Sequence, residues 1–136
     1  MGVRTKLINS PYNAYQNARE TLEDDAELTR VGPGTPCGEY LRRFWHPIAF
    51  TNSLDNVPLR VRIMGEDLVL FRDKSNRIGL LALHCSHRGT SLEFGIIQER
   101  GLSCCYHGWH FDIDGRILDT PAEPIESKLK NTLHHG

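Results

Sequence analysis

Two short segments that each pair a cysteine with a histidine constrain this chain more than any other feature. They are HCSHRGT (84–90) and CCYHGW (104–109), and each follows a predicted strand, so both are expected at loop tips. The paired side chains are Cys85 and His87 in the first segment, and Cys104 and His107 in the second. Two such loops lying side by side can close around one small inorganic centre. Cys105 directly follows Cys104 but is expected to point away from that centre.

Alternating apolar and polar residues between turn signals predict a series of short strands. The segments are LRVRIM (59–64), LVLFR (68–72), RIGLLALH (77–84) and WHFDIDGRIL (109–118), the last with Asp114 and Gly115 at its turn. A further hairpin is expected to turn near residues 99–101. This pattern indicates a mostly β, antiparallel domain.

The two ends of the chain differ in character from this central region. Residues 1–30 form a polar arm with a short helix predicted from about Thr21 to Arg30, with Thr21 as its N-cap. The Gly/Pro-rich segment VGPGTPCG opens the central domain, residues 31–120, and the tail at 121–136 is interpreted as a connector. The first core residues are expected to be Leu41, Phe44, Trp45 and Ile48.

The charge balance, the hydropathy and the cysteine content argue against a nucleic-acid-binding, membrane-spanning or disulfide-stabilised protein. Sixteen basic residues against seventeen acidic residues leave no strong positive charge for nucleic acid or anionic membrane. No apolar run is long enough to span a bilayer, and we expect a cytoplasmic protein. In that compartment the four cysteines are expected to be metal ligands or free thiols rather than disulfides.

Two kinds of inorganic centre fit two thiolates and two imidazoles. Zinc binds a Cys2His2 set, but its usual finger keeps the cysteines together and places the histidines on a helix. Here each loop contains one of each, which suits a 2Fe–2S cluster with both cysteines on one iron and both histidines on the other. Such a set is neutral with both irons ferric, whereas four thiolates would leave the oxidised cluster anionic. It therefore accepts an electron more readily.

The two segments resemble a known pair of loops. CSHRGTSLEFG and GLSCCYHGWHFDIDGRI are similar to the cluster-binding loops of the Rieske family, above all of Rieske non-haem iron oxygenases that hydroxylate or demethylate aromatic compounds. LTRVGPGTPCGEYLRRFWHPIAF resembles the lead-in of the phthalate-dioxygenase-like branch, so the similarity covers roughly residues 28 to 120. It implies an antiparallel Rieske-type β-sandwich, with Cys85 and Cys104 on the buried iron and His87 and His107 on the outer one.

Differences from other Rieske proteins define the branch further. Thr90 and Tyr106 stand where the proteins of respiratory and photosynthetic cytochrome complexes have a disulfide, and Trp109 replaces a serine that donates a hydrogen bond to the cluster. With fewer donors, the potential is expected in the lower part of the range of roughly −150 to +300 mV. The adjacent His134 and His135 have no following carboxylate, so we do not interpret them as the mononuclear iron site of an oxygenase.

The resemblance implies one-electron transfer. A reductase or ferredoxin would deliver electrons, and His107 would pass them to a mononuclear iron in the neighbouring subunit of a trimer, a site expected only in a catalytic domain outside these residues. Trp109 is interpreted either as a residue that shields the cluster or lines the electron path or as an ordinary packing residue beside the loop. Arg88 is expected to contact a partner or a neighbouring subunit. The alternatives are a stand-alone soluble Rieske ferredoxin and, less favoured, a zinc-binding interaction module.

Several other residues receive structural interpretations. Gly89 and Gly108 are expected to let the loop backbones turn with positive φ. The remaining histidines and cysteines near the motifs are interpreted as packing or surface residues without a metal; they are His46, His84, His110, Cys37 and Cys105.

Overall fold

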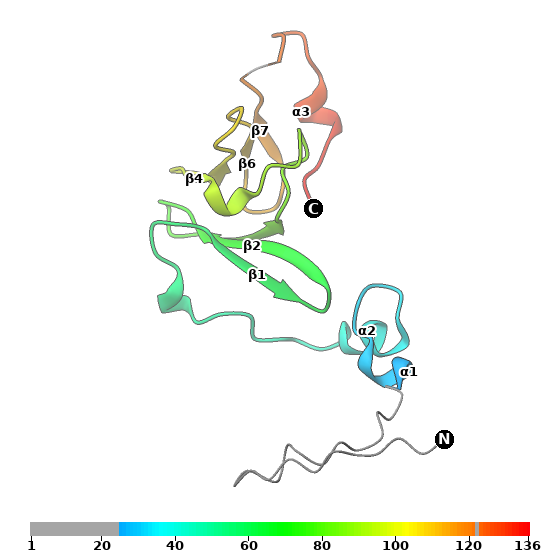
Figure 1. Ribbon diagram of the computed structural model, residues 1–136. Coiled ribbons are helices and arrows are strands. Elements are labelled where there is room, and N and C mark those ends of the chain that lie inside the picture. The colour runs from blue at the N-terminus through cyan, green and yellow to red at the C-terminus, as the bar shows by residue number, and fades with distance from the viewer. Residues whose placement is uncertain (1–24, 122) are drawn as a thin grey trace, which may run out of the picture.

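The strands of the computed structural model form two antiparallel sheets (Figure 1), and the structure describes residues 25–121 and 123–136. The first sheet has the order β1-β2-β3 and the second has the order β4-β5-β6-β7. The strands are β1 Leu59–Ile63, β2 Glu66–Arg72, β3 Ile78–Ala82, β4 Ile96–Ile97, β5 Leu102–Ser103, β6 His110–Phe111 and β7 Ile117–Asp119. Every strand pair is antiparallel, which confirms the predicted mostly β fold.

The first sheet follows from the alternation seen in the sequence. β1 pairs with β2 in the register Leu59↔Leu70, and β2 pairs with β3 in the register Leu70↔Leu80. The turn between β1 and β2 lies at Met64 and Gly65, both with positive φ, so β2 begins two residues before the predicted strand 68–72. Pairing of Ile63 with Glu66 is the reason, because it extends the ladder to the turn itself.

One hydrophobic core joins the two sheets. Its buried side chains from the first sheet and the segment after it are Val69, Phe71, Leu81, Leu83 and Leu92. Those from the second sheet and its loops are Ile97, Leu102, Trp109, Phe111 and Ile117, and the core also contains Cys85 and Cys104. The core therefore reaches directly to the two predicted cysteine loops.

Short helices occupy the connections. They are α1 Ala26–Thr29, α2 Pro36–Leu41, the 3-10 turns η2 Thr51–Ser53 and η3 Leu92–Phe94, and α3 Leu129–Thr132. α1 lies within the predicted helix 21–30, but Asp25 caps it by accepting a hydrogen bond from the Glu27 N–H, and the predicted cap Thr21 is outside the described residues. None of the helices in the described ranges has the length and apolar character needed to cross a membrane.

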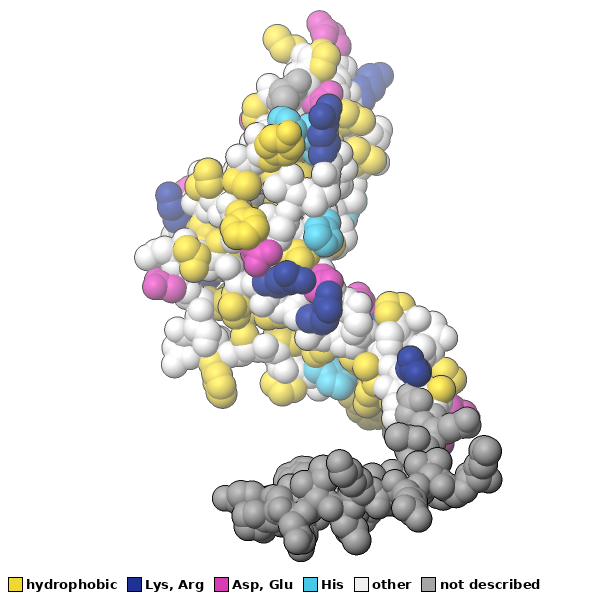
Figure 2. All heavy atoms as spheres, in the orientation of Figure 1, with side chains coloured by type: hydrophobic (Ala, Val, Ile, Leu, Met, Phe, Trp, Pro, Cys, Tyr) yellow, Lys and Arg dark blue, Asp and Glu magenta, His cyan; other side chains and the backbone are white. Residues whose placement is uncertain are grey.

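The prediction that the core begins in the segment 41–48 was wrong for its two aromatic residues. Phe44 is 54% exposed and Trp45 is fully exposed, whereas Leu41 and Ile48 are half-buried. Between α2 and β1 the only regular element in the described residues is the short 3-10 turn η2, and Leu54, which follows it, is buried whereas Phe44 and Trp45 are not. Figure 2 shows hydrophobic side chains standing out on this face of the molecule. Amphipathic composition alone does not show which apolar side chains another part of the same chain will cover.

Candidate metal centre

Two loops with the same backbone hydrogen-bonding pattern carry the predicted site. In the first, the Cys85 N–H donates to the Thr90 carbonyl and the Gly89 N–H donates back to the Cys85 carbonyl, at 2.9 and 2.8 Å. In the second, the Cys104 N–H donates to the Trp109 carbonyl and the Gly108 N–H to the Cys104 carbonyl, at 2.8 and 3.1 Å. Gly89 and Gly108 have φ of 72° and 74°, as predicted, so each loop closes at a residue that tolerates the left-handed region.

The loops bring all four predicted side chains together. Cys85 and Cys104 are buried at 3% and 4% exposure, and their side chains interact with each other. The rings of His87 and His107 meet edge to face with their centroids 4.6 Å apart, and both residues are half-buried. The thiols thus lie at the core and the imidazoles toward the surface.

Burial and neighbouring charge set the protonation of these groups. Burial raises the pKa of the Cys85 thiol to about 11, while the backbone N–H groups of His87 and Arg88, which hydrogen-bond to its sulfur, oppose that rise. Burial also lowers the pKa of His107, with smaller contributions from His87 and Arg88. A neutral imidazole is the form that binds a metal. A buried thiol becomes a thiolate when a metal supplies the compensating positive charge.

A partnerless buried nitrogen indicates that the site is built for an additional group. His87 Nδ1 is buried and has no hydrogen-bond partner among the described residues, and the same holds for Trp109 Nε1. The Trp109 ring stacks on the His87 ring with the centroids 4.8 Å apart and the planes 2° from parallel. Since buried polar atoms rarely lack a partner, an imidazole nitrogen in this state fits a metal-ligand role.

The grouping of the donors bears on the kind of metal centre. Within the described residues, no three His, Cys, Asp or Glu side chains are arranged around a position for one metal ion. Structural zinc requires four ligands around a single ion, whereas a 2Fe–2S cluster takes only two protein ligands per iron. One cysteine and one histidine in each loop give the two thiols and two imidazoles that a 2Fe–2S cluster with two protein ligands per iron would take.

The residues around the loops are placed as follows. Arg88 is exposed, Trp109 is 2% exposed, and the exposed Tyr106 has its ring centroid 3.8 Å from that of His107. The four cysteines are free; Cys105 is exposed and Cys37 is half-buried. His46, His84 and His110 each contact a backbone carbonyl, of Leu41, Gly89 and Arg100 respectively.

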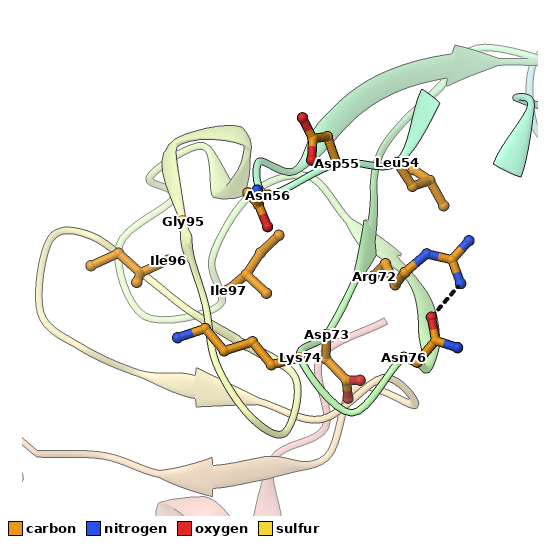
Figure 3. Close-up of a pocket in the computed structure, with 10 residues that line it drawn as sticks. All are labelled: Leu54, Asp55, Asn56, Arg72, Asp73, Lys74, Asn76, Gly95, Ile96 and Ile97. Carbon is orange, nitrogen blue, oxygen red and sulfur yellow. Dashed lines mark hydrogen bonds between the residues drawn. The ribbon is translucent and has the colours of Figure 1, made fainter. Parts of the chain in front are cut away.

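A surface pocket of about 740 Å³ lies elsewhere in the fold (Figure 3). Its ten lining residues come from the segment before β1, the end of β2 with its following turn, and β4 with the preceding Gly95, and they include none of the four predicted ligands. Arg72 is held to Asn76 across its rim by a hydrogen bond of 3.0 Å. The pocket is therefore separate from the paired loops.

Comparison with known proteins identifies the class. The family model described as the Rieske [2Fe-2S] domain matches residues 44–130, more than half of the chain. The chain belongs to the Rieske [2Fe–2S] domain family, whose cofactor is a 2Fe–2S cluster.

Relatives within the family are oxygenase subunits. One relative is the tert-butanol monooxygenase / tert-amyl alcohol desaturase oxygenase subunit of Aquincola tertiaricarbonis. The sequence identity is 51%, and the alignment covers 100% of this chain and 30% of that subunit. A second relative is the phenoxybenzoate dioxygenase subunit alpha of Ectopseudomonas oleovorans. The sequence identity is 56%, and the alignment covers 82% of this chain and 27% of that subunit. The chain thus spans less than a third of these relatives.

Solved structures agree with this assignment. Dicamba monooxygenase bound to dicamba superimposes with a TM-score of 0.57 and 32% identity, over 60% of this chain and 26% of that chain. NdmA of Pseudomonas putida CBB5 superimposes with a TM-score of 0.58 and 32% identity, over 66% of this chain and 30% of that chain.

Proposed function

We propose that Cys85, His87, Cys104 and His107 bind the 2Fe–2S cluster, and that the chain transfers single electrons. The observation that carries this proposal is the pair of matching loops, which place two buried thiols beside two half-buried imidazoles. The unpartnered His87 Nδ1 supports it independently. When bound, the cluster supplies a centre that gains and loses one electron.

The proposed roles of the four side chains follow from how deeply each one is buried. Cys85 and Cys104 hold the inner iron where the core excludes water, and His87 and His107 hold the outer iron near the surface. We propose that His107 is the electron exit, that Trp109 shields the inner face of His87, and that the exposed Arg88 contacts a partner protein. These roles require that the side of the site formed by His87 and His107 faces the partner proteins, and that the side formed by Cys85 and Cys104 faces the core.

We propose that this chain acts as the N-terminal electron-transfer part of an aromatic-ring-hydroxylating or demethylating oxygenase. The similarity to oxygenase subunits over 82% to 100% of the chain supports this. A reductase or ferredoxin would supply the electrons, and a mononuclear iron in the neighbouring subunit of a homotrimer would receive them. A stand-alone Rieske ferredoxin is the second candidate, and a cytoplasmic location stays a prediction.

Metal analysis and one substitution test the cluster assignment. We expect the anaerobically reconstituted protein to contain two irons and two acid-labile sulfides per chain, with a Rieske-type spectrum. The substitution His107→Cys adds a thiolate charge, so a cluster should still form but its midpoint potential should fall by more than about 100 mV, toward all-cysteine values.

The control for this substitution is His84→Ala, which removes a neighbouring exposed imidazole whose Nδ1 lies 3.1 Å from the Gly89 carbonyl oxygen. It should leave the midpoint potential unchanged. Wild-type protein that binds one zinc and no sulfide, or a His107→Cys potential equal to that of the wild type, would overturn the proposed ligand set.

A further inference from the structure

The last residues of the chain lie between the two sheets and contact both. The His135 N–H donates to the Gly115 carbonyl at 2.8 Å, and the Ala82 N–H donates to the Gly136 carbonyl. His134 also forms a β-bridge with Arg116. Figure 1 shows this segment descending from α3 to the chain end beside the first sheet. The segment 133–136 therefore connects the end of β3 with the turn between β6 and β7.

Gly115, in the turn between β6 and β7, allows the backbone of residues 133–136 to approach closely. Gly115 has φ of 81°, and a Cβ at this position would lie 1.7 Å from the His135 carbonyl oxygen. No side chain fits there, because that distance is far inside van der Waals contact. The predicted Asp-Gly turn thus serves as a docking surface for the backbone of the tail, in addition to reversing the hairpin.

The His135 side chain is buried and satisfied on both nitrogens. It is 3% exposed, and its ring packs against Phe111 with the centroids 4.6 Å apart. Nε2 lies 2.9 Å from the Ala82 carbonyl oxygen, and Nδ1 lies 3.1 Å from Ser86 Oγ. A carbonyl only accepts, so Nε2 carries the hydrogen and Nδ1 accepts from the Ser86 hydroxyl. Burial lowers the pKa of His135, in agreement with this neutral tautomer.

Ser86 lies in the first loop, next to the backbone N–H groups that hydrogen-bond to the Cys85 sulfur. It lies between Cys85 and His87, and the N–H groups of His87 and Arg88 hydrogen-bond to the Cys85 sulfur. The peptide that joins Ser86 to His87 supplies the first of these donors. Fixing the Ser86 side chain therefore restrains the direction in which that N–H points.

We propose that His135 is a positioning residue that holds Ser86 so that the loop N–H groups stay directed at the Cys85 sulfur, an inference that rests on the proposed role of Cys85 as a cluster ligand. Hydrogen bonds to a ligand sulfur stabilise the reduced cluster and raise its potential. His135 lies outside the segment that the Rieske family model matches, residues 44–130. The residue that holds Ser86 therefore comes from outside the matched segment, although Ser86 itself lies within it.

Substitutions can separate the two hydrogen bonds of the ring. Ser86→Ala removes only the hydroxyl of an exposed residue. His135→Asn keeps an acceptor near the position of Nδ1, and His135→Gln keeps a donor near the position of Nε2. His134→Ala is the matched control, because it removes the neighbouring exposed imidazole.

We expect Ser86→Ala and His135→Gln to lower the midpoint potential, change the g-values of the reduced cluster and release iron to a chelator about twofold to tenfold faster. His135→Asn should restore the g-values toward those of the wild type, and His134→Ala should match the wild type throughout. A purely structural role for His135 would lower the melting temperature but leave the potential and g-values of Ser86→Ala unchanged, and that result would overturn the inference.

Hydrogen exchange on the iron-free chain keeps this inference separate from the proposed function. Ser86→Ala should accelerate exchange of the His87 and Arg88 amides, and unchanged exchange would also overturn the inference. If the wild type binds no cluster, the proposed function fails whatever the exchange result. If the cluster is normal and Ser86→Ala changes nothing, only the role of His135 fails.

Discussion

At the scale of single residues, Asp112 is a buried carboxylate held by two arginines. Its side chain is 5% exposed and accepts hydrogen bonds from Arg100 Nε at 3.0 Å, Arg77 Nη2 at 3.1 Å and the Ile113 N–H at 2.9 Å. The bond from Arg100 contributes most to lowering the pKa of Asp112 to about 2. Asp112 thereby ties together the β2–β3 turn, the β4–β5 hairpin and the start of the β6–β7 turn.

The substitution Asp112→Asn should lower the free energy of unfolding at pH 7 by about 2 kcal/mol, the usual contribution of a hydrogen bond to a charged group. The native pKa lies below the unfolded value near 3.9, so the stabilising effect is complete above that value and is lost as the pH falls through about 2. Urea unfolding of both proteins from pH 7 to pH 2 measures this. A difference between the two proteins that stays constant over this range would contradict it.

Individual residues also show what the sequence could predict. Cys85, His87, Cys104 and His107 were expected to converge because their motifs follow strands, and the structure brings them together. His135 was not expected at the site, since it lies far from Ser86 in the sequence and no spacing rule links them. Only the tertiary fold places the tail on the first loop.

At the scale of elements, Arg42 fastens the N-terminal helices to the first sheet. Its guanidinium hydrogen-bonds to the Val31 carbonyl at 3.2 Å, the Met64 carbonyl at 3.1 Å and Glu66. In Figure 1 these helices lie beside the end of the first sheet that carries the β1–β2 turn. Arg42 therefore joins the segment before α2, through Val31, to the β1–β2 turn and the start of β2.

The substitution Arg42→Gln should loosen the helices without affecting the sheets. We expect hydrogen exchange of the backbone amides in residues 31–43 to increase at least about threefold, because local opening becomes easier when surface attachments are lost. Exchange in β2 and β3 should not change. The neighbouring exposed arginine provides the control as Arg43→Gln, and equal effects of the two substitutions would refute the anchoring role.

The elements differ in how well their sequence predicts them. The hairpins were predictable because the alternation of LRVRIM and the Asp-Gly signal describe local geometry, which the residues themselves determine. The exposure of Trp45 was not predictable, since burial depends on which element packs on a segment. The boundaries of the domain, placed at residues 31 and 120, stay predictions.

At the scale of the whole molecule, the paired loops join parts of the fold that the sheets leave separate. The first loop lies between the two sheets in the chain, and the second lies between β5 and β6. A cluster held by both loops would cross-link them at the shared core, to which Cys85 and Cys104 both belong. Metal binding and folding are therefore expected to be coupled.

Removal of the cluster should lower the free energy of unfolding by several kcal/mol, because two buried thiols and the His87 Nδ1 lose their partners. Urea unfolding of the reconstituted protein before and after chelation measures this change. Reconstitution of the chelated sample, which should restore the original midpoint, controls for irreversible damage. Equal midpoints before and after chelation would contradict the coupling.

The strand order has a consequence for biosynthesis. In each sheet, neighbouring strands are also consecutive in the chain, so every strand meets its partner among residues that the ribosome has just added. The ladder of the second sheet is complete at Asp119, and both cysteine loops precede that residue. Both sheets and both cysteine loops are therefore synthesised before the segment 133–136, whose His135 contacts Ser86 of the first loop.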